Sequence, residues 1–541
     1  MAKSKQSKKR KAAKAPQQER QLGQFNLDEY VDKYIWLIVP LLVILYYWFS
    51  TQSTGFYQDD EIGHYRNMRG FWGDPWSIMG NQPKPGWKIL MVVPGLFGFP
   101  GVVLAQSLIA ALTVVATYYL GKALKLKNAS IGALFLAVQP LFLQLSFRAY
   151  SEITAGLFVV LMILFYVKEQ YILAAITSSY IFSIRQEFAL VSLALGVLFL
   201  MKKRYIPFVL LGWTPVVLAL IGWMHTGNPM WLIEDMRRIG LEVTVPHKPF
   251  WHYFETYIYM VGPFILGLFL VGYWAFLTPT SHIKENLKKE GFLFFTFTIM
   301  WAWSVISAWD VPDFGANPGH WRYLLSIAPL TAIYAAKGMN IVFNKERAQY
   351  VGVVLAAYVL IVLVFLSRET NGLTLLDEAS YTNFIMSLAL LAIVAAFIYL
   401  RAIPAKAFVT VIAIATVAFT LYAEEPRKLD TEASTVKQAS EWYMEQPELH
   451  DRPLYGNHAL FRYFADIDIT DKARDHVMAL ETLEDAPKGA IVVWDSHYGN
   501  SQFGGDVPME FFQENPDYEL LHQIISSDQT FGILIFEKIN E

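Results

Sequence analysis

The chain has 541 residues, of which 54% are hydrophobic and only 17% are charged, and it contains no cysteine. Soluble domains carry about 25% charged residues, so this composition indicates a membrane protein, and the lack of cysteine excludes disulfides, thiolate metal sites and cysteine nucleophiles. The formal net charge of -3 divides into -15 from residue 424 onward and +12 before it, which predicts two parts in different surroundings.

The first 33 residues precede the apolar part of the chain. Eight Lys and Arg residues stand within the first 21 positions, among Gln, Ala and Ser and without an apolar face. This pattern is typical of a disordered basic tail. The next apolar stretch has no small-residue cleavage pattern behind it, which disfavours a signal peptide. We therefore expect residues 1–33 to form a cytoplasmic tail.

Apolar segments then follow one another from residue 34 to residue 422. A helix that crosses a bilayer needs about 20 predominantly apolar residues, and several segments are shorter than that. We predict about thirteen transmembrane helices, so that residues 34–423 form a polytopic α-helical membrane domain. The predicted spans are residues 34–50, 101–121, 129–145, 153–167, 171–184, 188–201, 205–223, 254–277, 291–308, 323–341, 350–366, 381–400 and 403–422.

Lys and Arg residues are unevenly divided between the two sides of these spans. With the amino terminus in the cytoplasm, one side holds 24 of them and the other holds 11, as the positive-inside rule favours. Nucleic-acid binding explains these charges poorly, because they lie in short loops. The outside loops would be residues 51–100, 144–152, 185–187, 224–253, 309–322 and 367–380.

The first outside loop carries three consecutive carboxylates, Asp59, Asp60 and Glu61. Adjacent anions at the edge of a low-dielectric layer repel one another. Because this arrangement is unfavourable, it indicates a functional role for the three carboxylates. One use is as a general base that takes a proton from a hydroxyl, and another is divalent-cation binding. A solvated acidic loop tip is the alternative.

The rest of this loop combines tryptophans with tight turns. Trp72, Trp76 and Trp87 surround a turn rich in Pro and Gly that contains Lys84. Indole rings stack on sugar faces or lie at the level of lipid headgroups, so Trp76 and Trp87 are candidate contacts for a sugar or a lipid. The apolar run 89–99 is too short to span a membrane, and we expect it to lie at the interface or to re-enter.

Arginines recur on the outside, where the topology rule disfavours positive charge. Arg148 and Glu152 are four residues apart, Arg185 lies in a second short turn, and His320 and Arg322 precede another span. A guanidinium matches the geometry of phosphate oxygens, so several converging at the outer boundary would suit a lipid phosphate. Snorkelling or pairing with a nearby Glu is the alternative for each one.

The last 118 residues, 424–541, have the composition of a soluble domain. We expect a helix over residues 433–444 and strands over 490–494 and 532–536, which predicts a small α/β domain on the outside. Residues 494–499 resemble the Trp-Trp-Asp-Tyr-Gly motif of oligosaccharyltransferases. Their spacing differs by one residue and the first Trp is missing, so a strand that ends in a Gly-containing turn is the preferred interpretation.

Taken together, these features resemble the GT-C glycosyltransferases, which are membrane enzymes that take a sugar from a polyprenyl-phosphate carrier. The resemblance is to the protein O-mannosyltransferases and the lipid A aminoarabinose transferases, and it covers most of the chain. It rests on Asp60-Glu61 followed by Tyr65, on Lys84-Pro85, on Arg148 to Glu152, and on His320 to Tyr323 before a helix with Pro329.

The resemblance implies a role for each of these residues. Asp60 would be the catalytic base, supported by Glu61 or Asp59. The donor phosphate would be bound by Lys84, Arg148, Arg185, Arg322 and His320, with Glu152 and Tyr65 in support. The enzyme would be inverting, with an undecaprenyl- or dolichyl-phosphate sugar as donor and a protein, lipid or glycan as acceptor. Which acid is the base, and whether Mg²⁺ or Mn²⁺ binds at Asp59 and Asp60, stays open.

Two other functions are compatible with so many spans. An oligosaccharyltransferase would depend on a divalent metal. A transporter or flippase would need ionisable groups in the middle of helices and paired halves, and the sequence has neither. A Cys-free outside domain favours a bacterial inner membrane over the endoplasmic reticulum, with the carboxyl-terminal domain in the periplasm.

Overall fold

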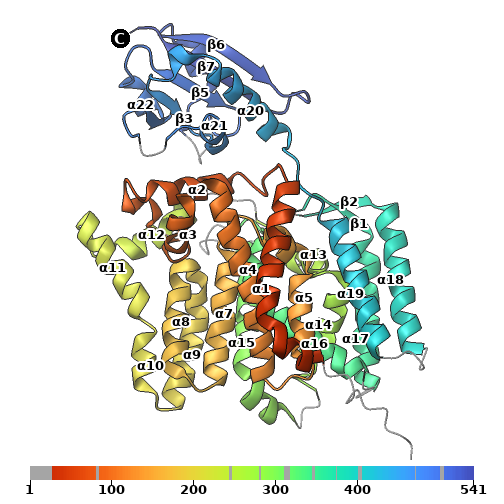
Figure 1. The fold of residues 1–541 in the computed structure, drawn as a ribbon. Helices are drawn as coiled ribbons and strands as arrows, with labels where there is room; N and C mark the ends of the chain where they lie inside the picture. The colour runs from red at the N-terminus through yellow and green to blue at the C-terminus, as the bar shows by residue number, and fades with distance from the viewer. Residues whose placement is uncertain are drawn as a thin grey trace, which may run out of the picture.

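The computed structural model describes residues 27–80, 84–242, 247–278, 282–309, 317–343, 348–372, 374–399, 405–468, 471–499 and 505–540. A bundle of helices forms one layer, and a smaller domain with a β-sheet lies on one end of it (Figure 1). Most of the predicted tail, residues 1–26, lies outside the described residues.

Five helical segments among the described residues are long and apolar enough to cross a membrane, or six if one bent pair counts as a span. The prediction of about thirteen spans is therefore not confirmed. The five are α1 (Leu27–Gln52), α4 (Gly98–Ala123), α10 and α11 together (Tyr205–Leu210 and Trp213–Thr226), α15 (Ile283–Ala308), and η5 with most of α16 (Trp321–Ile327 and Ala328–Phe343).

The bent pair consists of α13 (His252–Val261) and α14 (Pro263–Trp274), which meet at an angle of 116°. Gly262 between them has a φ of +83°, a conformation that suits glycine, and Pro263 begins the second helix. The predicted span 129–145 is likewise divided, because Pro140 starts a new helix. Breaks of this kind make continuous apolar stretches into helices too short to count as spans.

The remaining helices of the bundle are shorter, and in Figure 1 several of them stand beside the long ones. They are α5 (Ala129–Ala137), α6 (Pro140–Leu145), α7 (Glu152–Val167), α8 (Tyr171–Ile184), η3 (Gln186–Phe188), α9 (Ala189–Met201), α12 (Trp231–Glu242), α17 (Ala348–Ile361), η6 (Val362–Leu366), α18 (Tyr381–Tyr399) and α19 (Ala405–Ala423), with a hairpin of β1 (Arg368–Thr370) and β2 (Leu375–Ala379).

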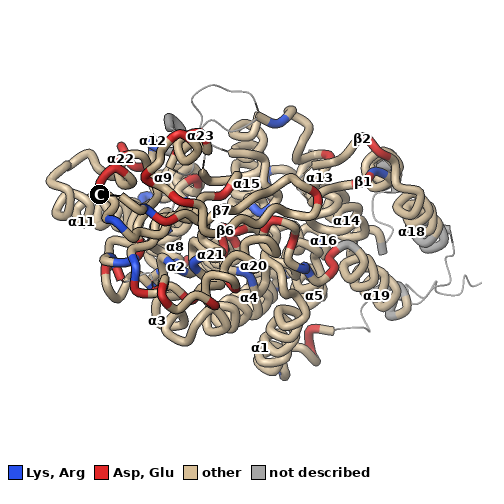
Figure 2. Tube along the Cα trace, turned by 90° about the horizontal axis from the view of Figure 1, so that it is seen from above, with Lys and Arg blue, Asp and Glu red and all other residues tan. Residues whose placement is uncertain are grey.

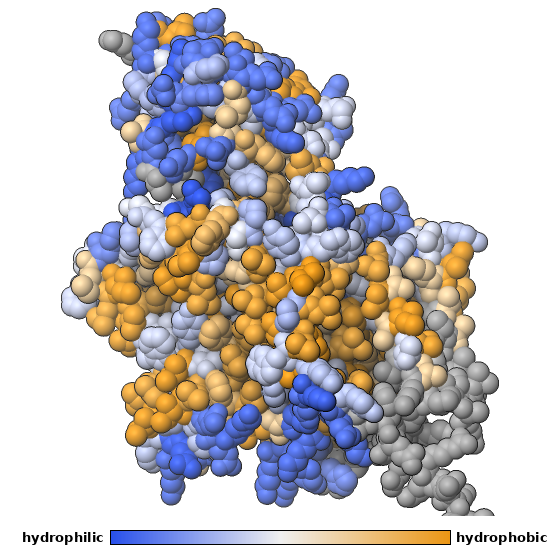
Figure 3. Space-filling model, viewed as in Figure 1, coloured by the Kyte–Doolittle hydropathy of each residue, from blue (hydrophilic) through white to orange (hydrophobic). Residues whose placement is uncertain are grey.

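On the face shown in Figure 3, apolar residues form a belt across the bundle, with hydrophilic residues above and below it. Many large apolar side chains of α1, α10 and α11 are exposed, for example Trp36, Ile44, Val209 and Met224. Burying so much apolar surface in lipid is favourable. The chain is therefore a multi-pass membrane protein, as the sequence predicts.

Helix α1 begins at Leu27, before the predicted start of the first span at residue 34. The buried carboxylate of Asp28 accepts hydrogen bonds from the backbone nitrogens of Ala129 and Ser130, each at 2.9 Å. A carboxylate at a helix N-terminus satisfies free N–H groups and complements the helix dipole. Asp28 thereby joins the start of α1 to the start of α5.

The segment predicted as the first outside loop, residues 51–100, is largely helical, whereas the sequence analysis names only its apolar run 89–99 as a segment at the interface. It contains α2 (Asp60–Gly70), η2 (Pro75–Ile78) and α3 (Pro85–Gly95). The side chain of Asp59 accepts a hydrogen bond from the backbone nitrogen of Asp60, and Asp60 and Glu61 occupy the first helical turn. Three acids at a helix N-terminus are favoured by the dipole, and α2 lies across the end of the bundle (Figure 1).

The carboxyl-terminal domain contains a five-stranded sheet in the order β4-β3-β5-β7-β6. Strand β3 is parallel to both β4 and β5, β7 is antiparallel to β5, and β6 is antiparallel to β7. The predicted helix and both predicted strands are present. The elements are α20 (Thr431–Met444), η7 (Pro447–Leu449), β3 (Leu454–Gly456), α21 (Ala459–Phe464), β4 (Asp475–Val477), α22 (Leu480–Glu484), β5 (Ile491–Asp495), α23 (Met509–Glu514), β6 (Tyr518–Ile525) and β7 (Gly532–Lys538).

One residue of α2 belongs to the core of this domain. Ile62 is fully buried in the cluster that also contains Val436, Leu460 and Ile491. The bundle and the carboxyl-terminal domain therefore share apolar contacts at α2. Viewed from above, acidic residues are spread over the carboxyl-terminal domain, while α18 and α19 at the side are almost free of charge (Figure 2).

Candidate active site

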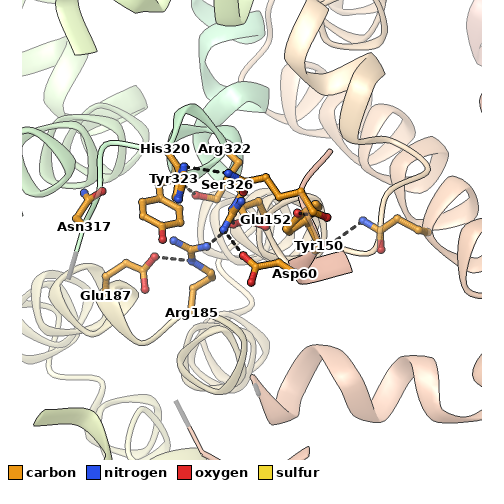
Figure 4. Close-up of polar contacts among 12 residues, drawn as sticks. Asp60, Tyr150, Glu152, Arg185, Glu187, Asn317, His320, Arg322, Tyr323 and Ser326 are labelled. Carbon is orange, nitrogen blue, oxygen red and sulfur yellow. Dashed lines mark hydrogen bonds and ion pairs between the residues drawn. The ribbon is translucent and has the colours of Figure 1, made fainter. Parts of the chain in front are cut away.

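Charged side chains from four elements meet in one network (Figure 4). One of these elements, α2, lies at the end of the bundle that faces the carboxyl-terminal domain (Figure 1). Asp60 starts α2, Glu152 starts α7, Arg185 ends α8 and Arg322 lies at the start of η5. The sequence predicts each of them at an outside boundary, and the structure brings all four together.

These four groups alternate in charge. Arg322 contacts Asp60 at 2.8 Å and Glu152 at 3.6 Å. Arg185 contacts Glu152 at 2.6 Å and Glu187 at 2.5 Å. The side chain of Arg322 is 7% exposed and that of Glu152 is 3% exposed, whereas that of Asp60 is 47% exposed. Asp60 is therefore the most exposed carboxylate of this network, ahead of Glu187 at 20%, and the one that solvent or a substrate reaches most easily.

Aromatic rings hold the two guanidinium groups in place. Arg322 lies 4.7 Å from the ring centre of Tyr150, and Arg185 lies 4.7 Å from that of Tyr323. Such cation–π contacts are favourable and fix the plane of the guanidinium. Nη1 of Arg322 is buried and has no hydrogen-bond partner among the described residues. A buried donor without a partner is costly, so this atom is suited to an anionic ligand.

Glu61 and Arg148 form a second pair one residue further along α2. Both are buried, and their charged atoms lie 3.6 Å apart. Glu61 also accepts a hydrogen bond from the backbone nitrogen of Tyr57, and Arg148 donates to the carbonyl of Gly55 and to the hydroxyl of Ser53. Burial raises the pKa of Glu61 above its ordinary value. The structure thus places Arg148 in contacts that hold the loop before α2.

Asp59 faces the carboxyl-terminal domain. The hydroxyl of Tyr498, in the turn after β5, donates a hydrogen bond to its carboxylate. Burial, followed by the neighbouring charge of Asp60, raises the pKa of Asp59. Strand β5 ends at Asp495 and residues 496–499 form a turn, as the preferred interpretation of residues 494–499 predicts. This contact could not be predicted, because Asp59 and Tyr498 are far apart in the sequence.

Lys84 and His320 lie at the border of the network. Burial, followed by the charge of Arg185, lowers the pKa of Lys84 to about 8, so it remains mostly protonated at neutral pH. Burial, followed by the charge of Arg322, lowers the pKa of His320 to about 3, which leaves a neutral imidazole. Lys88, one turn after Lys84 and fully buried, is a cation that the sequence analysis missed.

The aromatic residues named from the sequence lie in packed surroundings. Tyr65 makes edge contacts with Phe99 and Tyr463, and the ring of Trp76 stacks on His225 with ring centres 3.8 Å apart. Trp87 is fully buried, so a sugar face cannot reach its ring in this structure.

No group of three His, Cys, Asp or Glu side chains placed to hold a metal ion is found in the described part of the chain. Asp59 and Asp60 have different partners, Tyr498 and Arg322. The guanidinium of Arg322 already lies against Asp60, and the described residues supply no third carboxylate or imidazole ligand beside these two acids. The residues therefore do not fit the divalent cation that the sequence left open.

This architecture is similar to that of solved structures, although the sequence alone reveals no relative. No protein family and no curated protein matches the chain by sequence. Two solved structures of ArnT from Cupriavidus metallidurans, one bound to undecaprenyl phosphate and one in the apo state, match with a TM-score of 0.58 and 11% sequence identity. They cover 93% and 94% of this chain and 98% of ArnT.

The arabinofuranosyltransferase AftD from Mycobacteria gives a lower TM-score of 0.45, with 11% identity and coverage of 94% of this chain and 40% of AftD. The match to ArnT confirms the predicted resemblance at the level of the fold, which this chain shares with ArnT over nearly its whole length.

Proposed function

We propose that this protein is an inverting glycosyltransferase that moves a sugar from a polyprenyl-phosphate donor to a hydroxyl of an acceptor. The observation that carries the proposal is the contact between Asp60, an exposed acid, and Arg322, a buried cation whose Nη1 has no hydrogen-bond partner in the described part of the chain. A base and an anion-binding group next to each other are what this reaction needs.

Asp60 is proposed as the base. Its carboxylate takes the proton of the acceptor hydroxyl while the oxygen attacks the anomeric carbon and forms the new glycosidic bond. The bond from that carbon to the phosphate oxygen breaks, and its electron pair leaves with the polyprenyl phosphate. A phosphate is a good leaving group, so the step needs no strong general acid.

Arg322 is proposed to bind the donor phosphate, together with Arg185 and Lys84. Positive groups fixed in a partly dry site stabilise the charge that grows on the leaving phosphate. In the structure Arg322 is paired with Asp60. A phosphate that competes for Arg322 would release Asp60, so donor binding would prepare the base.

The carrier class is proposed from the fold. The ArnT structure that this chain matches was determined with undecaprenyl phosphate, and the site described above offers cations to a phosphate at the end of the bundle. A carrier of the same chemical class would place its isoprenoid chain along the apolar belt and its phosphate at Arg322.

The orientation is proposed from charge. The basic loops lie in the cytoplasm, and the carboxyl-terminal domain of residues 424–541, with the site, lies outside, in a bacterium on the periplasmic side of the inner membrane. The membrane domain would comprise residues 34–423. Outside the cytoplasm the donor must be a lipid-linked sugar, because the lipid carries the sugar across the membrane.

Asp60→Asn tests the proposed base. The variant should lose transfer from a radiolabelled lipid-linked sugar by at least about 100-fold, as expected when a general base is removed. It should still be stabilised against thermal unfolding by undecaprenyl phosphate. Asp377→Asn, at an exposed acid far from the site, is the matched control. Full transfer by the Asp60 variant would overturn the assignment.

A further inference from the structure

A polar cavity of about 520 Å³ lies along α2, between the bundle and the carboxyl-terminal domain. Its lining consists of three glycines together with Arg66, Asn67, Asp74, Ser77 and Lys472. Lys472 is the one lining residue from the carboxyl-terminal domain, and it contacts Asp74 at 3.1 Å. Both halves of the molecule therefore contribute to this cavity, and a volume of this size is in the range of small-molecule sites.

The cavity follows the face of α2 that carries Asp60. Gly63, Asn67 and Gly70 line it, and they lie three, seven and ten positions after Asp60, a spacing that places side chains on one face of a helix. With a rise of 1.5 Å per residue, Gly63 is about 4.5 Å along the axis from Asp60. The cavity therefore begins at Gly63, about one helical turn from the proposed base.

The lining favours a hydroxyl-rich ligand. It contains no apolar side chain, so an acyl chain or an isoprenoid would gain little there. Arg66 and Lys472 are donors, Asp74 is an acceptor, and Asn67 and Ser77 can act as either. Nε of Arg66 is buried without a hydrogen-bond partner among the described residues, although its Nη2 is bound to Asp475 at 2.5 Å.

We propose that this cavity binds the saccharide part of the acceptor and presents one of its hydroxyls to Asp60. The inference rests on the proposed function, and it adds the substrate class: a carbohydrate acceptor held by α2, the η2 turn and the carboxyl-terminal domain. The donor lipid and the acceptor then approach Asp60 from different sides, the lipid from Arg322 and the saccharide from Gly63.

Gly63 allows the cavity to be filled without disturbing the fold. A Cβ at Gly63 meets no atom within 4 Å, so Gly63→Phe should place its ring in the cavity at little cost to stability. Gly352 in α17 has equally open surroundings and lies in another part of the bundle. Gly352→Phe is therefore a matched control.

The test uses the labelled full-length protein in detergent on an array of defined neutral oligosaccharides, which also carries acyl chains and peptides. The native protein should bind at least one oligosaccharide in a saturable way. Gly63→Phe should weaken this binding by at least about tenfold, which corresponds to about 1.4 kcal/mol, and Gly352→Phe should not change it. Equal binding by the Gly63 variant, or binding only to acyl chains or peptides, would overturn the proposal.

A second measurement separates this inference from the proposed function. Undecaprenyl phosphate should stabilise the native protein and the Gly63→Phe variant equally against thermal unfolding, because the variant leaves Arg322 untouched. If undecaprenyl phosphate stabilises neither, the proposed function fails, while the array still decides whether the cavity binds saccharides. If it stabilises only the native protein, Gly63→Phe has disturbed the donor site. The proposal that the donor binds at Arg322 and the saccharide binds separately, at Gly63, is then wrong.

Discussion

Two arginine–carboxylate pairs lie at the start of α2 and use adjacent members of one acidic triplet. Glu61 and Arg148 are both buried, and Arg148 has further partners in the preceding loop. Asp60 is 47% exposed, and among the residues that the structure describes its partner Arg322 retains an N–H group without a hydrogen-bond partner. The same residue types thus serve two purposes. Glu61 and Arg148, the closed pair, hold the backbone in place, whereas Asp60 and Arg322, the open pair, can accept a ligand.

The largest effect is expected at the open pair. Arg322→Lys keeps the positive charge but loses the fork that contacts two acids, so we expect transfer to fall by about 100-fold or more. Initial rates with the lipid-linked sugar measure this loss, and stabilisation by undecaprenyl phosphate should weaken with it. Arg69→Lys, at an exposed position near the end of the same helix, should keep the native rate. A native rate in the Arg322 variant would show that the two pairs do not differ in this way.

The closed pair should affect folding more than chemistry. Arg148→Met leaves the buried Glu61 without its partner, which costs about 3 kcal/mol of unfolding free energy. Chemical denaturation in detergent measures this cost, and Arg69→Met is the matched control. A loss no greater than that of the control would mean that Arg148 does not hold the loop, and would favour its predicted role at the donor phosphate.

The smallest effect concerns pH. Burial raises the pKa of Glu61 in the folded protein above its ordinary value of 4.5. Just above pH 4.5 the folded state therefore retains a proton that the unfolded state has released, so the free energy of unfolding falls as the pH rises through this range. Glu61→Gln cannot titrate there, and it should lose this part of the slope.

Denaturation curves between about pH 4.5 and 7 measure that slope. Glu378→Gln changes an exposed acid and should leave the slope as it is in the native protein. If the Glu61 variant has the native slope, Glu61 is ionised in the folded protein, and the closed pair is a fully charged one.

Features of the fold and the site could be predicted from the sequence where they depend on the pattern of neighbouring residues. Four site residues stand at the ends of apolar segments: Asp60, Glu152, Arg185 and Arg322. The distribution of Lys and Arg assigns all four of these ends to the same side of the membrane, so they are expected to lie near one another. The α/β nature of the carboxyl-terminal domain follows in the same way from its local pattern. Each of these features depends on residues that are close together in the chain.

Other features depend on contacts that local patterns do not contain. Tyr498 reaches Asp59, and Ile62 enters the core of a distant domain, although neither side chain is unusual in its own segment. The predicted number of spans is not confirmed for a related reason. Apolar composition does not show where a helix ends, and breaks such as those at Pro140 and Gly262 divide segments that look continuous.

The burial of Ile62 has a consequence for the order in which the molecule is assembled. Helix α2 leaves the ribosome early, but its apolar partners Val436 and Ile491 are made only after the whole bundle has been inserted. Until then Ile62 has no core to pack against, although Met68 of α2 is buried in the core of the bundle, and Asp59 lacks its contact with Tyr498. The reactive end of the molecule would therefore be completed last, and a chain that stops before residue 424 would keep its membrane helices but have an unfinished site.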